Sequence, residues 1–218
     1  MTTNTRLYDK AFLTGCDSTT EWMLPWFIEH LKDHTDQPLV FADFGVEDID
    51  YVRKHVHAVI DMTKTQESGW FKKPSSMFHC PARKTVWIDT DIQVKNSIDD
   101  IFDLLQPGKL NMVKDKPWST RMQTEMYNSG IVGFIDKPAI LGKWAQRVKD
   151  NPERGDQETL HAMLDPLQNL TYINSLPNKF NYLRLQFEND DQPIPNNVVG
   201  IHWTGHKGKD RIREMMNA

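Results

Sequence analysis

Short apolar runs that alternate with amphipathic, helix-like stretches are the feature of this sequence that most constrains its fold. The runs predict strands at Arg6–Thr14, Pro38–Asp43, His57–Ile60, Lys84–Asp89, Leu110–Lys114, Ile131–Ile135 and Val198–Trp203. The stretches between them predict helices at Thr20–His34, Glu47–Lys54, Pro138–Asp150, Asp156–Leu164 and Lys209–Asn217, with one more that starts near Pro74. Strands and helices that alternate along a chain usually build a largely parallel sheet covered by helices. The sequence therefore predicts an α/β sandwich around a mixed, mostly parallel sheet.

The length and composition predict one globular domain over residues 1–218. The 218-residue chain is 39% hydrophobic and 26% charged, and its net charge of −4 argues against a broad nucleic-acid-binding surface. No run of about 18 apolar residues predicts a transmembrane helix, and the polar segment Met1–Lys10 is not typical of a signal peptide. Cys16 and Cys80 are too few for a disulfide framework, so we expect a reducing, cytoplasmic location.

An apolar strand that ends in two closely spaced carboxylates is the strongest chemical signal. Val86–Ile88 lead directly into Asp89, Thr90 and Asp91. Ligands of open α/β sheets bind beyond the carboxyl ends of strands, and two carboxylates this close repel each other unless a cation lies beside them. A hard divalent cation such as Mg²⁺ or Mn²⁺ prefers such oxygen ligands. The pair therefore predicts a metal site, although solvated or helix-capping aspartates have the same spacing.

A second strand, near the end of the sequence, leads into a basic, glycine-containing segment. His202 can supply a third metal ligand. Gly205 and Gly208 permit close backbone approach, and Lys207 or Lys209 can hold a phosphate. A flexible basic turn beside a core histidine is the competing interpretation.

Two further segments carry polar groups at positions suited to a ligand. Asn128 precedes a predicted strand and can bind a sugar hydroxyl, and Gly130 can let a ligand approach. Asp156 and Gln157 begin a predicted helix, whose positive end can face a sugar. A plain β-turn and an ordinary helix N-cap are the alternatives at these two places.

In this order, the four segments resemble the retaining glycosyltransferases of family 8, which have the GT-A fold. The resemblance runs from about Phe12 to Lys209. It implies a UDP-sugar donor and a Mn²⁺ ion held by Asp89, Asp91 and His202. The donor-binding residues that it implies are Cys16, Asp17, Trp22 (stacked on uracil), Lys72, Lys73, Thr90, Gly205, Lys207 and Lys209, besides the two aspartates. It also places Asn128, Asp156 and Gln157 beside the sugar, and Ser129 stands where this family usually has alanine.

The resemblance implies an enzyme that transfers a hexose from its nucleotide to an unknown acceptor with retention of anomeric configuration. One departure concerns the family's late motif, His-x-x-Gly-x-x-Lys-Pro. Gly208 stands where that lysine is expected, so Lys207 or Lys209 must replace it. The short chain also leaves little room for a C-terminal extension that binds a membrane or an acceptor.

Other functions fit parts of the pattern. A phosphohydrolase of the haloacid dehalogenase type also has Asp-x-Asp after an apolar strand, but Gln93 stands where Thr or Val is usual. A nucleotide-sugar-binding protein without catalysis would keep the same residues. A nucleotidyltransferase would need a basic, glycine-rich loop, which Thr14–Asp17 does not provide. Lys64–Lys72 and Asn189–Asn197 are predicted as loops, the second one as a candidate lid.

Overall fold

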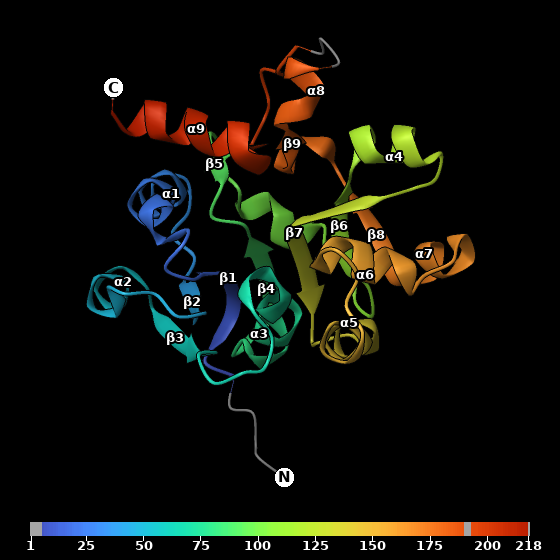
Figure 1. Cartoon of the computed structure of the whole chain (residues 1–218), viewed down its shortest axis with the longest axis horizontal. Helices are drawn as coiled ribbons and strands as arrows, with labels where there is room; N and C mark the ends of the chain where they lie inside the picture. Colours follow the sequence, from blue (N-terminus) through green and yellow to red (C-terminus); the bar gives the residue numbers. More distant parts are fainter. Residues whose placement is uncertain (1–5, 190–192, 218) are drawn as a thin grey trace.

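A seven-stranded sheet forms the centre of the protein, with strand order β3-β2-β1-β4-β7-β6-β8 (Figure 1). The computed structural model describes residues 6–189 and 193–217. The strands are β1 (Tyr8–Cys16), β2 (Leu39–Asp43), β3 (Ala58–Asp61), β4 (Ala82–Ile88), β6 (Leu110–Lys114), β7 (Tyr127–Ile135) and β8 (Ile173–Leu176). Only β7 runs antiparallel to its two neighbours, and the remaining pairs are parallel. The expected mixed, mostly parallel sheet is confirmed.

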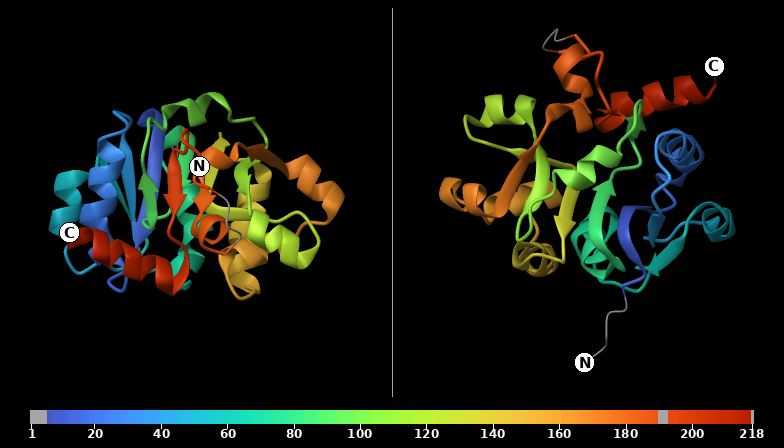
Figure 2. Two further views of the ribbon diagram at one scale, coloured as in Figure 1. Left: turned by 90° about the horizontal axis from the view of Figure 1, so that it is seen from above. Right: turned by 180° about the vertical axis from the view of Figure 1, so that it is seen from behind.

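Helices cover both faces of this sheet (Figures 1 and 2). One face packs against α1 (Leu24–Lys32), α2 (Ile49–His55) and α9 (Gly205–Met216), and the other against α3 (Lys73–His79), α5 (Ala139–Asp150) and α6 (Asp156–Ala162). Alternation along β4 shows why both faces are apolar. Val86 and Ile88 join the first buried cluster, whereas Trp87 between them joins the second. The result is the predicted α/β/α sandwich.

A second, three-stranded sheet brings the end of the chain to the middle of the sequence. It consists of β5 (Ile92–Val94), β10 (Gly200–His202) and β9 (Tyr182–Leu183), in the order β5-β10-β9. The chain leaves the large sheet at Ile88 and enters the small one at Ile92. β10 is antiparallel to β5, and His202 lies opposite Ile92 in their register. This pairing places His202 next to Asp91, 111 positions earlier in the chain.

Several elements differ from the sequence prediction. β7 begins at Tyr127 instead of Ile131, because Asn128 and Ser129 are buried and hydrogen-bonded inside the sheet. α9 begins at Gly205 instead of Lys209. The sequence did not predict β5, β8, β9, α4 (Lys116–Met122), α7 (Pro166–Tyr172), α8 (Arg184–Glu188) or the 3₁₀ turns η2 (Gly69–Lys72), η3 (Asp99–Asp103) and η4 (Asn178–Phe180). The 3₁₀ turn η1 (Glu21–Met23) and α1 together occupy the predicted helix Thr20–His34.

Two predictions from the sequence lie partly outside the described residues. They concern the polar segment Met1–Lys10 and the loop Asn189–Asn197. Pro74 lies in the first turn of α3, as its rigid φ angle predicts. Among the described residues, no helix is long and apolar enough to cross a bilayer.

Candidate functional site

A cavity of about 590 Å³ opens where the crossover between the two sheets meets the start of α6. Most residues that the sequence singled out line it. They are Cys16, Asp17, Lys73, Asp89, Thr90, Asp91, Asn128, Gly130, Asp156, Gln157, His202, Gly205 and Lys209. The structure thus brings all four sequence segments to one pocket. Trp22, Lys72, Lys207 and Gly208 are not among its lining residues.

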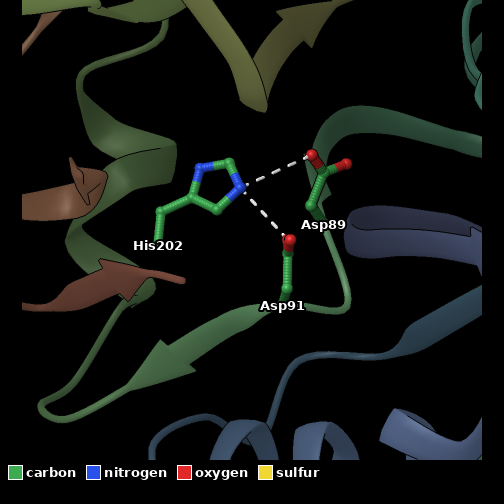
Figure 3. Close-up of side chains that lie close together, drawn as sticks. All are labelled: Asp89, Asp91 and His202. Carbon is green, nitrogen blue, oxygen red and sulfur yellow. Dashed lines mark ion pairs between the residues drawn. The ribbon is translucent and has the colours of Figure 1, made fainter. Parts of the chain in front are cut away.

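The two aspartates and the histidine converge at one point of this pocket (Figure 3). Nε2 of His202 lies 3.1 Å from Oδ1 of Asp91 and 3.9 Å from Oδ2 of Asp89. Lys209 also reaches Asp91, with Nζ 3.3 Å from Oδ2. Burial acts to raise the pKa of Asp91, but the charges of His202 and Lys209 outweigh it and hold this pKa well below its usual range. Asp91 is therefore a carboxylate at neutral pH.

The donor set of this cluster fits a divalent cation such as Mn²⁺ or Mg²⁺. One oxygen from each aspartate and one imidazole nitrogen lie within 4.8 Å of one another, so one ion can contact all three. The imidazole turns Nε2 toward the carboxylates, while Nδ1 is hydrogen-bonded to Oδ1 of Asn181 at 2.9 Å. A histidine whose second nitrogen is held in this way is typical of metal sites.

Lys73 lies between two carboxylates that come from different elements. Its Nζ is 3.0 Å from Oδ1 of Asp89 and 3.2 Å from Oδ2 of Asp156. Burial acts to lower the pKa of Lys73, but Asp156 and Asp89 more than offset this effect and raise it above its usual value. Burial also raises the pKa of Asp156, which Lys73 opposes. The single positive charge of Lys73 reduces the repulsion between the two carboxylates and holds Asp89 in its position in the Asp89–Asp91–His202 cluster.

A chain of hydrogen bonds connects His202 to the start of α6. From His202 it passes through Asn181 to Oδ1 of Asn128 (2.8 Å), and from Nδ2 of Asn128 to Asp115 (3.1 Å). Asp115 also accepts a hydrogen bond from Nε2 of Gln157 at 3.2 Å, and Oε1 of Gln157 accepts one from the backbone of residue 129. These bonds hold Asn128 and Gln157 in fixed orientations at the pocket wall.

Sequence analysis missed Asp115 and Asn181, which are both almost fully buried. Asp115 directly follows the predicted strand Leu110–Lys114 and caps α4 through the backbone amide of Trp118. The rule that selected Asp89, a carboxylate just after an apolar strand, would have found it. Asn181 had no such signal, because the short strand β9 follows it and no periodic pattern surrounds it.

Three residues predicted to contact the donor do not line the pocket. The guanidinium of Arg213 lies 4.4 Å from the Trp22 ring, which packs against the core instead of lining the pocket. Lys72 is buried and donates to the carbonyls of Phe44 and Met62, so it joins two loops. Lys207 is exposed outside the pocket, whereas Lys209 lines it.

The structure explains why glycine occupies three positions at the site. A side chain at residue 208 would overlap the carbonyl of Trp203, so this backbone has no room for the lysine that the family motif places there. Gly205 has a φ of 72°, which suits glycine at the start of α9. Gly130 was expected to give space to a ligand, but it gives space to the ring of His202.

The sandwich and the aspartate pair at its strand end define a class of protein: the chain has the GT-A fold of glycosyltransferases. It is similar to the solved glycosyltransferase GlyE of Streptococcus pneumoniae TIGR4, with a TM-score of 0.67 and 17% identity over 90% of this chain. It is also similar to the galactosyltransferase LgtC solved with donor and acceptor sugar analogs, with a TM-score of 0.60 and 14% identity over 95% of both chains. A glycosyltransferase involved in glycosylation of the major capsid of PBCV-1 matches with a TM-score of 0.63 and 12% identity, over 95% of this chain and 98% of the other.

These similarities establish the fold. No protein-family profile and no curated protein matches the sequence. The chain spans only 55% of GlyE.

Proposed function

We propose that this chain is a metal-dependent glycosyltransferase that moves a hexose from a UDP-sugar to an acceptor hydroxyl, with retention of anomeric configuration. The convergence of Asp89, Asp91 and His202 at one point of the pocket carries this proposal. The GT-A fold and the resemblance of the four sequence segments to family 8 support it. We propose further that residues 1–218 act as one such domain and that the protein works in the cytoplasm.

Positive charge gathers where a diphosphate would leave. A divalent cation held by Asp89, Asp91 and His202 would supply charge that stabilises the leaving diphosphate. Lys209 lies beside Asp91 in the same part of the pocket. The first turn of α9, which starts at the lining residue Gly205, adds backbone N–H groups that attract anions. These groups would lower the barrier by stabilising developing negative charge.

Negative and polar groups from other elements line the same pocket, where they would face the sugar. They are the carboxylates of Asp115 and Asp156 and the amide of Gln157. They would orient sugar hydroxyls and stabilise positive charge at the anomeric carbon. In a retaining reaction the acceptor hydroxyl attacks from the face that the leaving group vacates, and a phosphate oxygen can take its proton. Such a route needs no strong protein base.

The acceptor is not defined, but two tryptophans are candidates to contact it. Trp70 and Trp118 line the pocket, and the Trp70 side chain is 60% exposed. Nε1 of Trp70 would lie 3.9 Å from a Cβ at Gly155, the residue before Asp156. An exposed indole beside the proposed sugar position could stack on an acceptor.

A thermal-shift panel of nucleotide-sugars, each with and without Mn²⁺, tests the donor and the metal together. We expect a UDP-hexose to raise the melting temperature only when Mn²⁺ is present. Asp91→Asn should abolish this shift and the transfer reaction while the fold stays intact. The matched control is Asp61→Asn, because Asp61 also ends a strand of the large sheet but does not line the pocket. Wild-type activity in Asp91→Asn would contradict the metal assignment.

Product analysis separates the remaining alternatives. An NMR spectrum of the product's anomeric proton should show the configuration of the donor, and an inverted product would make Asp156 a candidate base. Release of phosphate from simple esters would favour the phosphohydrolase. Binding of UDP and Mn²⁺ without hydrolysis or transfer would favour a protein that binds nucleotide-sugars without catalysis.

A further inference from the structure

Asn181 has a fully buried amide that contacts His202 of the candidate metal cluster on the side of the ring that faces away from the carboxylates. It lies between η4 and β9 and has 0% exposed surface, and it does not line the pocket. Its Oδ1 is 2.9 Å from Nδ1 of His202, and its Nδ2 is 2.8 Å from Oδ1 of Asn128. An amide in this position can only act through its two neighbours.

One backbone amide fixes the direction of every hydrogen bond in this group. The N–H of Gly130 can only donate, so the atom of Asn128 that it contacts at 2.9 Å must be the carbonyl oxygen Oδ1. The carboxylate of Asp115 only accepts, which places Nδ2 of Asn128 at the other end of that amide.

The same logic extends to His202. Since Oδ1 of Asn128 accepts, the group of Asn181 that faces it must be the donor Nδ2. Oδ1 of Asn181 therefore faces His202 and needs a donor, which requires a proton on Nδ1 of the imidazole. Nε2 of the same ring faces the carboxylates of Asp89 and Asp91, which also only accept. A cation held by these carboxylates would meet this nitrogen, while Nδ1 keeps its hydrogen bond to Asn181.

We infer that Asn181 is a positioning residue that accepts a hydrogen bond from Nδ1 of His202 and so presents Nε2 to the metal ion. The inference deepens the proposed function and rests on it for the identity of the ion. Its geometric part stands on buried hydrogen bonds alone. Outer partners of metal-bound histidines typically change metal affinity by about 10- to 100-fold when they are removed.

The wild-type protein tests the tautomer without any substitution. In protein labelled with ¹⁵N-histidine, two-bond and three-bond ¹H–¹⁵N correlations identify the protonated nitrogen of each ring. The variant His202→Gln assigns the signals of His202. We expect a proton on Nδ1, whether or not Nε2 also carries one toward Asp91. A ring without a proton on Nδ1 would overturn the inference, whatever the metal-binding result.

Variants then test the effect on metal affinity, measured with Mn²⁺ alone by electron paramagnetic resonance. Asn181→Leu should move the proton away from Nδ1 and weaken Mn²⁺ binding by about 10- to 100-fold. Asn181→Asp keeps an oxygen that accepts from Nδ1–H, so we expect it to retain the Nδ1 proton. Its second oxygen then faces the acceptor Oδ1 of Asn128, so we expect Mn²⁺ affinity between those of wild type and Asn181→Leu. Wild-type affinity in folded Asn181→Leu would overturn the inference.

The matched control is Asn111→Leu. Asn111 is also 0% exposed, and its amide bonds the backbone of residues 106, 109 and 133 away from the pocket. We expect this variant to lower stability but to keep Mn²⁺ affinity and the His202 tautomer. Equal loss of Mn²⁺ binding in both leucine variants would mean that general loosening of the fold is the cause. Failure of the wild type to bind Mn²⁺, with or without UDP, would instead count against the proposed function, and the tautomer measurement would still stand.

Discussion

The imidazole of His202 lies against the backbone of Gly130, in the space that a side chain at residue 130 would fill. A Cβ there would come within 2.6 Å of Nδ1, and Cε1 would be closer still. Non-bonded contacts of a Cβ atom are essentially never this short, so the ring or the strand would have to move. The glycine of β7 and the histidine of β10 therefore depend on each other, although they belong to different sheets.

Gly130→Ala should displace His202 and weaken Mn²⁺ binding by at least about tenfold, although it changes no proposed ligand. The comparison variant is Gly142→Ala, because a Cβ at residue 142 in α5 makes only an ordinary contact of 3.5 Å with Phe78. Alanine in that helix should raise stability by about 0.5–1 kcal/mol and leave metal binding unchanged. Mn²⁺ titration and urea denaturation measure the two effects. Wild-type Mn²⁺ affinity in Gly130→Ala would contradict this prediction, because it would mean that the His202 ring can shift without losing the ion.

Lys209→Met should weaken binding of UDP in the presence of Mn²⁺ by about tenfold, which corresponds to about 1.4 kcal/mol. The physical reason is the loss of a cation that lines the pocket beside Asp91. Lys207→Met removes the same charge two residues earlier on the exposed side of α9 and should have little effect. Isothermal titration calorimetry compares the two variants. Equal losses would assign the effect to overall charge instead of position.

Lys73→Met should lower the free energy of unfolding by about 3–5 kcal/mol, because it leaves the buried carboxylate of Asp156 and the partly buried one of Asp89 without their shared cation. Arg53→Met is the surface control. The Arg53–Asp50 pair is 62% and 80% exposed, and such pairs contribute roughly 0–1 kcal/mol. Urea denaturation at neutral pH measures both. A stability of Lys73→Met close to that of Arg53→Met would mean that Asp89 and Asp156 tolerate each other.

Trp22→Leu should lower stability by about 1–3 kcal/mol and leave UDP affinity unchanged, since the ring packs on the core beneath Arg213. The family resemblance implies the opposite, a ring stacked on uracil. Thermal unfolding and UDP titration of the same sample decide between them. A large loss of UDP affinity with normal stability would restore the stacking role.

Much of the large sheet could be predicted because its strands are continuous apolar runs. β2 and β6 agree with the sequence prediction within one residue, and the aspartate pair falls where β4 ends. The first half of β7 could not be predicted in this way. Asn128 is polar, and its partners Asp115 and Asn181 are 13 and 53 residues away in sequence. When the hydrogen-bond partners of a buried polar residue are this distant in sequence, the local sequence alone predicts a turn at that residue.

The small sheet explains the other omissions. β5 and β9 have three and two residues, which is too short for any periodic pattern. Their pairing with β10 nevertheless decides that His202 meets Asp91. Asp115 was within reach of the rule that found Asp89, whereas Asn181 becomes recognisable only through its contacts in three dimensions.

The crossover at Asp89–Asp91 also bears on how a bound molecule would leave. The two carboxylates follow the end of β4 in the large sheet, and the imidazole belongs to β10 in the small sheet. A molecule or ion bound by all three groups therefore bridges the two sheets. Binding of such a molecule and separation of the two sheets are then thermodynamically linked, and each opposes the other.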